Sequence, residues 1–191
     1  RRPPACAGRR MEAAGITAII ARPHLSSTIL PSRRPRPFSF PRAFRSFRII
    51  RDMRIISLNT WGGIAGKEKL LAFFKKHAET TDVFCLQEIW AAAYEHLDCH
   101  MAGGRAIKHS EIMVNGLQDI STALPNHTAF FRPHFLDNFG LLMLVKKNLT
   151  IVEEGEIFVF KHKGHVPEGD VGNHARNIQY VTTQTATGPI T

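Results

Sequence analysis

The sequence predicts an α/β fold for residues 53–191, on three observations. Residues 54–61 form a β-branched apolar run that ends in polar residues before Gly62-Gly63, as a buried strand does. Residues 67–80 carry apolar side chains at helical spacing, and residues 82–87 form a second short apolar run. A strand, a helix and a strand in this order predict two parallel strands joined by a crossover helix.

The rest of this region predicts two more helices and then a series of strands. The helices are expected over residues 91–101 and 110–124, where they are followed by Gly103-Gly104 and by Pro125. Strands are expected over residues 128–133, 140–146, 149–161 and 175–185, with Ile190 beginning another. The first three of these strands have hairpin-like spacing, with the turn Lys147-Asn148 joining the second to the third, and a loop rich in glycine and histidine precedes the fourth.

Residues 1–52 differ in composition from everything that follows. They contain twelve arginines, no lysine and two acids and carry +10, whereas residues 53–191 carry −1. Four prolines between residues 31 and 41 interrupt any helix or strand, so we expect disorder here. Three interpretations stay open: a transit-like targeting segment, a basic arm attracted to RNA or membranes, or sequence outside the native protein, which would then start at Met53.

Charge, hydropathy and cysteines narrow the class of protein. The pI near 9.9 reflects residues 1–52, so the folding region lacks the basic excess that favours strong binding of duplex DNA. No stretch approaches the roughly 18–20 apolar residues of a membrane helix. The three cysteines, Cys6, Cys85 and Cys99, are an odd number without ligand-like spacing, which favours a reducing compartment, and we expect a cytoplasmic protein.

Two polar residues follow the apolar runs of the first two strands. Asn59 follows the first run and Glu88 the second, and the carboxyl ends of parallel neighbours open on one crevice. A carboxylate there is a suitable ligand for a hard cation such as Mg²⁺. A solvated loop residue, or a cap for the helix expected from residue 91, is the competing interpretation of Glu88.

Four segments, in order, resemble the endonuclease/exonuclease/phosphatase family of deoxyribonuclease I-like, metal-dependent phosphoesterases. Residues 54–61 (RIISLNTW) and 82–90 (DVFCLQEIW) are similar to its first two strands, which end in Asn and in Gln-Glu. Here Glu88 follows Asn59 by 29 residues. Residues 140–147 (GLLMLVKK) are similar to its glycine-led central strand, and residues 176–181 (RNIQYV) to its Arg-led strand. The resemblance covers residues 53–191 and none of residues 1–52.

The resemblance implies a fold and a set of site residues. The fold would be the N-terminal portion of a four-layer α/β sandwich, truncated, with two mixed sheets and helices outside. Glu88 would bind Mg²⁺ or Mn²⁺, and Asn59 would join it at the metal site and position the water or the scissile phosphate. Arg176 would be a third catalytic residue that contacts the substrate phosphate, or else a structural ion-pair partner. Gln87 would support Glu88 or would be an ordinary polar residue at a strand end.

The implied activity is divalent-metal-dependent hydrolysis of a phosphate ester by the full-length protein. The substrate would be a nucleic acid, a phospholipid or an inositol phosphate, and no stable protein partner is expected. The family's Asn-x-His, Asp-x-Asn and Ser-Asp-His motifs do not occur in this sequence, so the alternative is a non-catalytic fragment with an apolar sheet face exposed. His162, His165 and His174 do not replace these motifs, because their spacing favours a solvated loop over a zinc site.

Overall fold

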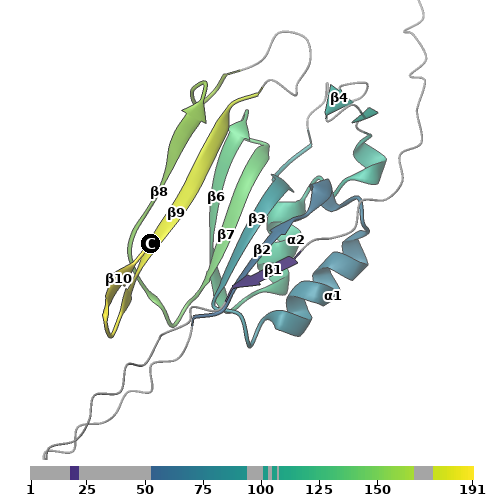
Figure 1. Cartoon of the computed structure of the whole chain (residues 1–191). Helices are drawn as coiled ribbons and strands as arrows, with labels where there is room; N and C mark the ends of the chain where they lie inside the picture. The colour runs from purple at the N-terminus through teal and green to yellow at the C-terminus, as the bar shows by residue number, and fades with distance from the viewer. Residues whose placement is uncertain (1–17, 22–52, 94–100, 103–104, 107, 166–173) are drawn as a thin grey trace, which may run out of the picture.

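The computed structural model describes residues 18–21, 53–93, 101–102, 105–106, 108–165 and 174–191, and within them it shows two packed β-sheets (Figure 1). The first sheet is mixed and has the order β1-β2-β3-β7-β6. Its strands are β1 (Ala18–Ala21), β2 (Ile55–Asn59), β3 (Val83–Trp90), β7 (Phe139–Lys146) and β6 (His127–Phe135). The second sheet is antiparallel, with the order β10-β9-β8, and consists of β8 (Thr150–Phe160), β9 (Arg176–Thr185) and β10 (Gly188–Ile190).

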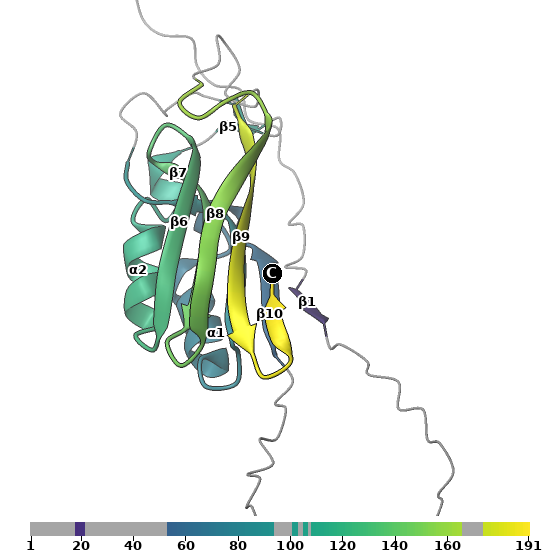
Figure 2. The same cartoon turned by 90° about the vertical axis from the view of Figure 1, so that its left-hand side faces the viewer.

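The helices and the second sheet lie on opposite faces of the first sheet. Figure 1 and Figure 2 show α1 (Lys67–His77) and α2 (Gly116–Ala123) on one face and β8, β9 and β10 across the other. Short elements complete the described chain: η1 (Trp61–Gly63), η2 (His109–Glu111), β4 (Met101–Ala102) and β5 (Arg105–Ala106). This layering confirms the predicted α/β sandwich. Within the described ranges, no helix is both long enough and apolar enough to span a bilayer.

The predicted parallel pair at the centre of the first sheet is confirmed. β2 and β3 run parallel, in a register that pairs Ile55 with Val83 and Asn59 with Gln87. The two strands are connected through α1, which begins at Lys67 as predicted and ends at His77. The register places the last residue of β2 beside Gln87, near the carboxyl end of β3.

The side chains of the first sheet point alternately to its two faces and form an apolar core on each face. One core lies under the helices and includes Phe74 of α1 and Phe84 of β3, whose rings meet edge to face at 5.6 Å. The other lies between the sheets and includes Val83, Val145 and Val181. Successive residues of one strand enter different cores because side chains alternate across a sheet.

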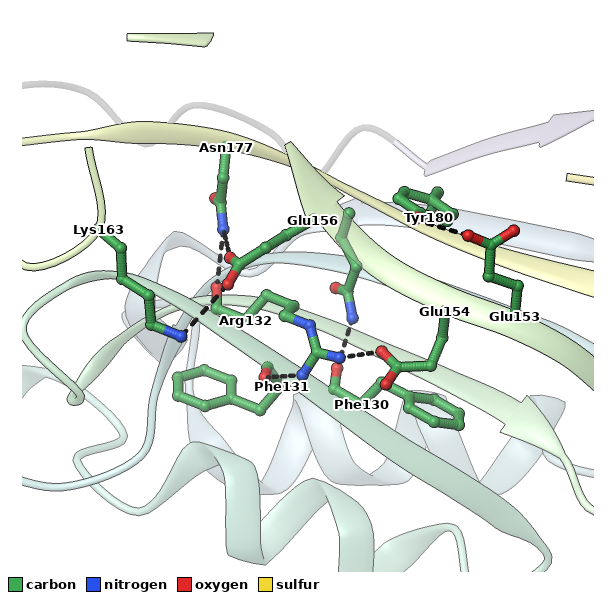
Figure 3. Close-up of polar contacts among 10 residues, drawn as sticks. Phe130, Phe131, Arg132, Glu153, Glu154, Glu156, Lys163, Asn177 and Tyr180 are labelled. Carbon is green, nitrogen blue, oxygen red and sulfur yellow. Dashed lines mark hydrogen bonds and ion pairs between the residues drawn. The ribbon is translucent and has the colours of Figure 1, made fainter. Parts of the chain in front are cut away.

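Polar contacts join the two sheets beside β6. Figure 3 shows the guanidinium of Arg132 on β6 directed at the carboxylate of Glu154 on β8, with which it forms an ion pair. The Asn177 amide donates to the Arg132 carbonyl at 3.4 Å and to Oε2 of Glu156 at 2.7 Å. The interface between the sheets is therefore apolar near β3 and β7 and polar beside β6.

Two predicted helices and one predicted strand pairing differ from the structure. Residues 91–93 are not helical and Met101 lies in β4, while residues 94–100 of the predicted helix lie outside the described residues. The helix predicted from residue 110 begins at Gly116, because the Met113 amide bonds to the carbonyl of Gly62 and draws the chain towards η1. After Lys147-Asn148 the chain does not return along β7, and β8 joins the second sheet.

A short strand from the arginine-rich segment extends the first sheet. β1 pairs antiparallel with β2, with Ala18 opposite Leu58 and Ala21 opposite Ile55. Residues 1–17 and 22–52 lie outside the described residues, so the disorder expected for them stays a prediction. The pairing gives β2 a hydrogen-bonding partner on the side away from β3.

Candidate functional site

Asn59 and Glu88 meet where β2 ends. Glu88 was expected to follow the second strand, but it lies within β3, two residues before that strand ends at Trp90. The Asn59 side-chain amide donates to Oε1 of Glu88 at 2.9 Å. The Asn59 carbonyl oxygen Oδ1 accepts the backbone N–H of Trp61 at 2.8 Å. A backbone N–H can only donate, so it must meet the amide oxygen, and this fixes the NH₂ group towards Glu88. Asn59 therefore orients the Glu88 carboxylate, and in this arrangement its own oxygen already accepts a hydrogen bond.

Glu88 lies in a β-bulge that sets the direction of its side chain. β3 pairs with β7 as Leu86 with Leu142 and then as Ile89 with Gly140, so the register shifts between the two pairs. Glu88 has a φ of 61°, in the left-handed region, which costs an L-residue about 1–2 kcal/mol. Bulges re-aim side chains in this way, often beside functional sites. The strained conformation directs Glu88 to Asn59.

Thr60 holds the backbone of this bulge. Its hydroxyl lies 2.9 Å from the carbonyl oxygen of Gln87 and 3.1 Å from that of Glu88. Its amide also donates to the Gln87 carbonyl, at 3.1 Å. Thr60 is 4% exposed, so water does not compete freely for these carbonyls. Thr60 was not predicted from the sequence, because a threonine at a strand end gives no signal until the bulge is seen.

Gln87 and Trp90 contact residues other than the Glu88 carboxylate. The Gln87 amide donates to Oγ of Ser57 at 3.3 Å and to the carbonyl of Cys85 at 3.1 Å, on the face opposite the helices. Burial raises the pKa of the neighbouring Cys85 thiol, which therefore stays protonated at neutral pH. Trp90 is buried and packs on Phe139, with ring centroids 4.7 Å apart. Gln87 thus ties β3 to β2.

Arg176, the third predicted catalytic residue, begins β9 in the second sheet. Its guanidinium donates to the carbonyl oxygens of His174 at 2.8 Å and Ala175 at 3.2 Å. The side chain is on the exposed part of the strand. The structure thus brings Asn59 and Glu88 into direct contact and places Arg176 on the other sheet, where its role as a phosphate ligand stays a prediction.

A buried histidine between the sheets was also missed from the sequence. His134 on β6 stacks on His174 with ring centroids 4.8 Å apart and an interplanar angle of 8°. Burial, together with the neighbouring His174, lowers the pKa of His134 to about 4. The two other histidines of the predicted loop cluster, His162 and His165, have ring centroids 5.6 Å apart.

The donor chemistry at Glu88 fits a magnesium-like cation. Among the described residues, no three His, Cys, Asp or Glu side chains come together as a metal-binding group. Mg²⁺ does not need such a group, because it usually keeps several waters and is held by one or two carboxylates together with substrate phosphates. Glu88, oriented by Asn59, supplies one carboxylate of this kind.

Comparison with known proteins gives a match over the region that contains this site. The family model described as "Endonuclease/Exonuclease/phosphatase family" matches residues 56–182. An endonuclease/exonuclease/phosphatase family protein from Bacteroides thetaiotaomicron is similar in structure, with 12% identity and a TM-score of 0.46 over 71% of this chain and 47% of that one. The endonuclease/exonuclease/phosphatase from Bacteroides vulgatus is also similar in structure, with 14% identity and a TM-score of 0.45 over 71% of this chain and 48% of that one. The chain spans about half the length of these structures. No curated protein matches it.

Proposed function

The chain belongs to the endonuclease/exonuclease/phosphatase family, and from this we propose that the whole protein hydrolyses a phosphate ester with the help of a divalent cation held at Glu88. The observation that carries the proposal is the contact of Asn59 with Glu88 at 2.9 Å, at the carboxyl ends of two parallel strands. Ligands of α/β proteins bind at such strand ends. The expected cation is Mg²⁺ or Mn²⁺, which both prefer oxygen ligands.

The residues of this chain have distinct roles in the proposed reaction. A divalent cation supplies charge neutralisation at the phosphate, which is a large part of catalysis in phosphoryl transfer. Glu88 holds the cation through its carboxylate. Asn59 restricts that carboxylate to one orientation, so that little reorganisation is needed when the substrate binds. Arg176 is proposed to contact the substrate phosphate, because a guanidinium matches the geometry of phosphate oxygens.

A non-catalytic role for the chain by itself is the second candidate. It is favoured because no three His, Cys, Asp or Glu side chains come together within the part of the chain that the structure describes, and because the sequence lacks the Asn-x-His, Asp-x-Asn and Ser-Asp-His motifs. Loss of one member of a catalytic group commonly reduces the rate by several orders of magnitude. We therefore expect the 191-residue chain to bind the cation without turning over a substrate.

Binding of Mn²⁺ to the chain, followed by electron paramagnetic resonance, tests the role of Glu88. We expect Glu88→Gln to weaken binding at least about tenfold, which corresponds to about 1.4 kcal/mol. Glu68→Gln is the matched control, because Glu68 is an exposed carboxylate on α1 and should leave binding unchanged. Equal affinity of wild type and Glu88→Gln would contradict the proposed metal site.

Hydrolysis of bis-p-nitrophenyl phosphate with Mg²⁺ separates the two candidates. Turnover by the chain that disappears in Glu88→Gln would refute the non-catalytic alternative. For the whole protein, a panel of abasic DNA, single-stranded nucleic acid, sphingomyelin and inositol phosphates would identify the substrate class. The near-neutral charge of residues 53–191 favours a small or lipid phosphate ester over duplex DNA.

A further inference from the structure

We propose that Thr60 is a positioning residue, whose buried hydroxyl holds Glu88 in its left-handed conformation and thereby aims the carboxylate at Asn59. The inference rests on the proposed function only in taking Glu88 as the metal ligand. Thr60 does not touch the cation or the substrate in this proposal. It acts through the backbone of Gln87 and Glu88.

The bulge at Glu88 allows β3 to bury Leu86 and Ile89 in one core while the Glu88 side chain stays outside it. Leu86 and Ile89 are 1% and 2% exposed, and both belong to the core under the helices. In a regular strand, residues three apart point to opposite faces, so both can enter one core only if an extra residue is accommodated between them. Without the bulge, Glu88 would lie on the helix face with Leu86. The bulge therefore buries Ile89 and frees the Glu88 carboxylate in one step.

The hydroxyl of Thr60 is placed to stabilise this bulge. Its oxygen lies within 3.1 Å of two successive carbonyl oxygens, those of Gln87 and Glu88. Two neighbouring carbonyls point towards one donor only where the strand departs from its alternating pattern, because peptide carbonyls of a regular strand point in opposite directions. The Thr60 amide also donates a hydrogen bond to the Gln87 carbonyl, so Thr60 contacts the bulge through both its backbone and its side chain.

Substitution by valine or serine separates two possible roles of Thr60, one as a space-filling side chain and one as a hydrogen-bond donor. Valine has nearly the shape of threonine and lacks the donor, while serine keeps the donor and loses the methyl group. A purely space-filling role for Thr60 predicts that valine is tolerated better than serine. A positioning role through the hydroxyl predicts the opposite order.

The experiment compares the 191-residue chain with Thr60→Val, Thr60→Ser and Thr60→Ala by nuclear magnetic resonance. The three-bond couplings about the N–Cα bond of Glu88 report the sign of its φ. We expect a positive φ in the wild type and Thr60→Ser, and its loss in Thr60→Val and Thr60→Ala. Mn²⁺ affinity should fall about tenfold in Thr60→Val and stay within about twofold of wild type in Thr60→Ser. Melting temperatures show whether each variant is folded.

Each result bears on the proposal separately from the metal site. A positive φ at Glu88 in a folded Thr60→Val chain overturns the proposal, even if Glu88→Gln still abolishes Mn²⁺ binding. A folded Thr60→Ser chain without the positive φ overturns it too, so the test holds even if neither Thr60→Val nor Thr60→Ala folds. If Glu88→Gln binds Mn²⁺ as the wild type does, the proposed metal site fails, while the φ of Glu88 still decides the role of Thr60.

Discussion

Nδ1 of His134 on the first sheet lies 3.0 Å from Oδ1 of Asn177 on the second sheet. The Asn177 amide nitrogen donates to Glu156, so its oxygen is the atom that faces the ring. His134 must therefore carry its proton on Nδ1, and this neutral tautomer donates across the interface between the sheets. The hydrogen bond connects β6 to β9. Because His134 is only 8% exposed, water does not compete freely for this bond.

Acid should weaken the folded state through His134. Its pKa of about 4 in the folded chain lies below the usual 6.5, so the unfolded chain binds the proton more readily. The free energy of unfolding should therefore fall as the pH drops from about 6.5 to about 4 and then stop changing for this group. The loss from His134 alone is at most about 3–4 kcal/mol. Urea unfolding at several pH values measures it.

The variant His134→Asn is the control for this pH dependence. Its amide nitrogen can replace Nδ1 as the donor to Asn177 and does not titrate. His127, whose pKa is lowered mainly by burial, remains in both chains and contributes equally. The stability of His134→Asn should decline less between pH 6.5 and 4 than that of the wild type. Parallel curves would show that His134 is not the responsible group.

The ion pair of Arg132 and Glu154 should give a modest coupling energy. Their side chains are 25% and 32% exposed, so water and salt screen them in part. A double-mutant cycle with Arg132→Met and Glu154→Gln should give a coupling of about 0.5–1 kcal/mol in the free energy of unfolding. The coupling should shrink in 1 M NaCl by the usual screening. Strictly additive single variants would exclude a stabilising pair.

Gly140→Ala should destabilise the chain severely. A Cβ at this position would lie 2.3 Å from the carbonyl oxygen of Arg132 and 2.5 Å from Cα of Pro133. Both are backbone atoms of the paired strand β6 and cannot rotate away, so we expect a loss of at least about 3 kcal/mol in the free energy of unfolding.

Gly164→Ala is the matched control for this substitution. Gly164 has a φ of +78° and no atom within 4 Å of the added Cβ. Its cost should be only that of the left-handed conformation, about 1 kcal/mol. Similar losses in the two variants, measured by urea unfolding, would refute the predicted backbone clash at Gly140.

The outer face of the second sheet should promote self-association. Ile157 and Ile178 are paired across β8 and β9 and are 58% and 55% exposed, and Val152 and Val159 extend the patch along β8. Ile157→Lys should lower the light scattering of concentrated chain and change the free energy of unfolding by no more than about 0.5 kcal/mol.

Ile151→Lys on the same strand provides the contrast. Ile151 packs against the core between the sheets, so a charge there should destabilise the fold instead of improving solubility. If Ile157→Lys scatters as much light as the wild type, the patch is not the cause of the association.

Periodicity predicted the elements whose signal is local. The strands that became β2, β3, β6 and β7, and the helix α1, all have apolar patterns that fit their own length. The meeting of Asn59 with Glu88 followed from the parallel order of β2 and β3. These predictions needed only the direction of each strand and the face of the sheet or helix on which each residue lies.

Features that depend on distant contacts could not be predicted in this way. The turn Lys147-Asn148 has the same chemistry whether the chain returns along β7 or crosses to the second sheet, and only packing decides between them. The bulge at Glu88 adds one residue without changing the composition of the strand. His134 gives no sequence signal, because its hydrogen-bond partner Asn177 on β9 lies 43 residues later in the chain.

The two faces of β2 make stability and chemistry depend on the same register. Leu58 is 2% exposed in the core under the helices, and the next residue, Asn59, contacts Glu88 on the other side. Sliding β2 by one residue past β3 would exchange these faces, so Leu58 would leave its core as Asn59 left the carboxylate. A one-residue deletion or insertion within β2 should therefore remove the site and the fold together. Only the substitution of a single side chain can remove the site and leave the fold intact.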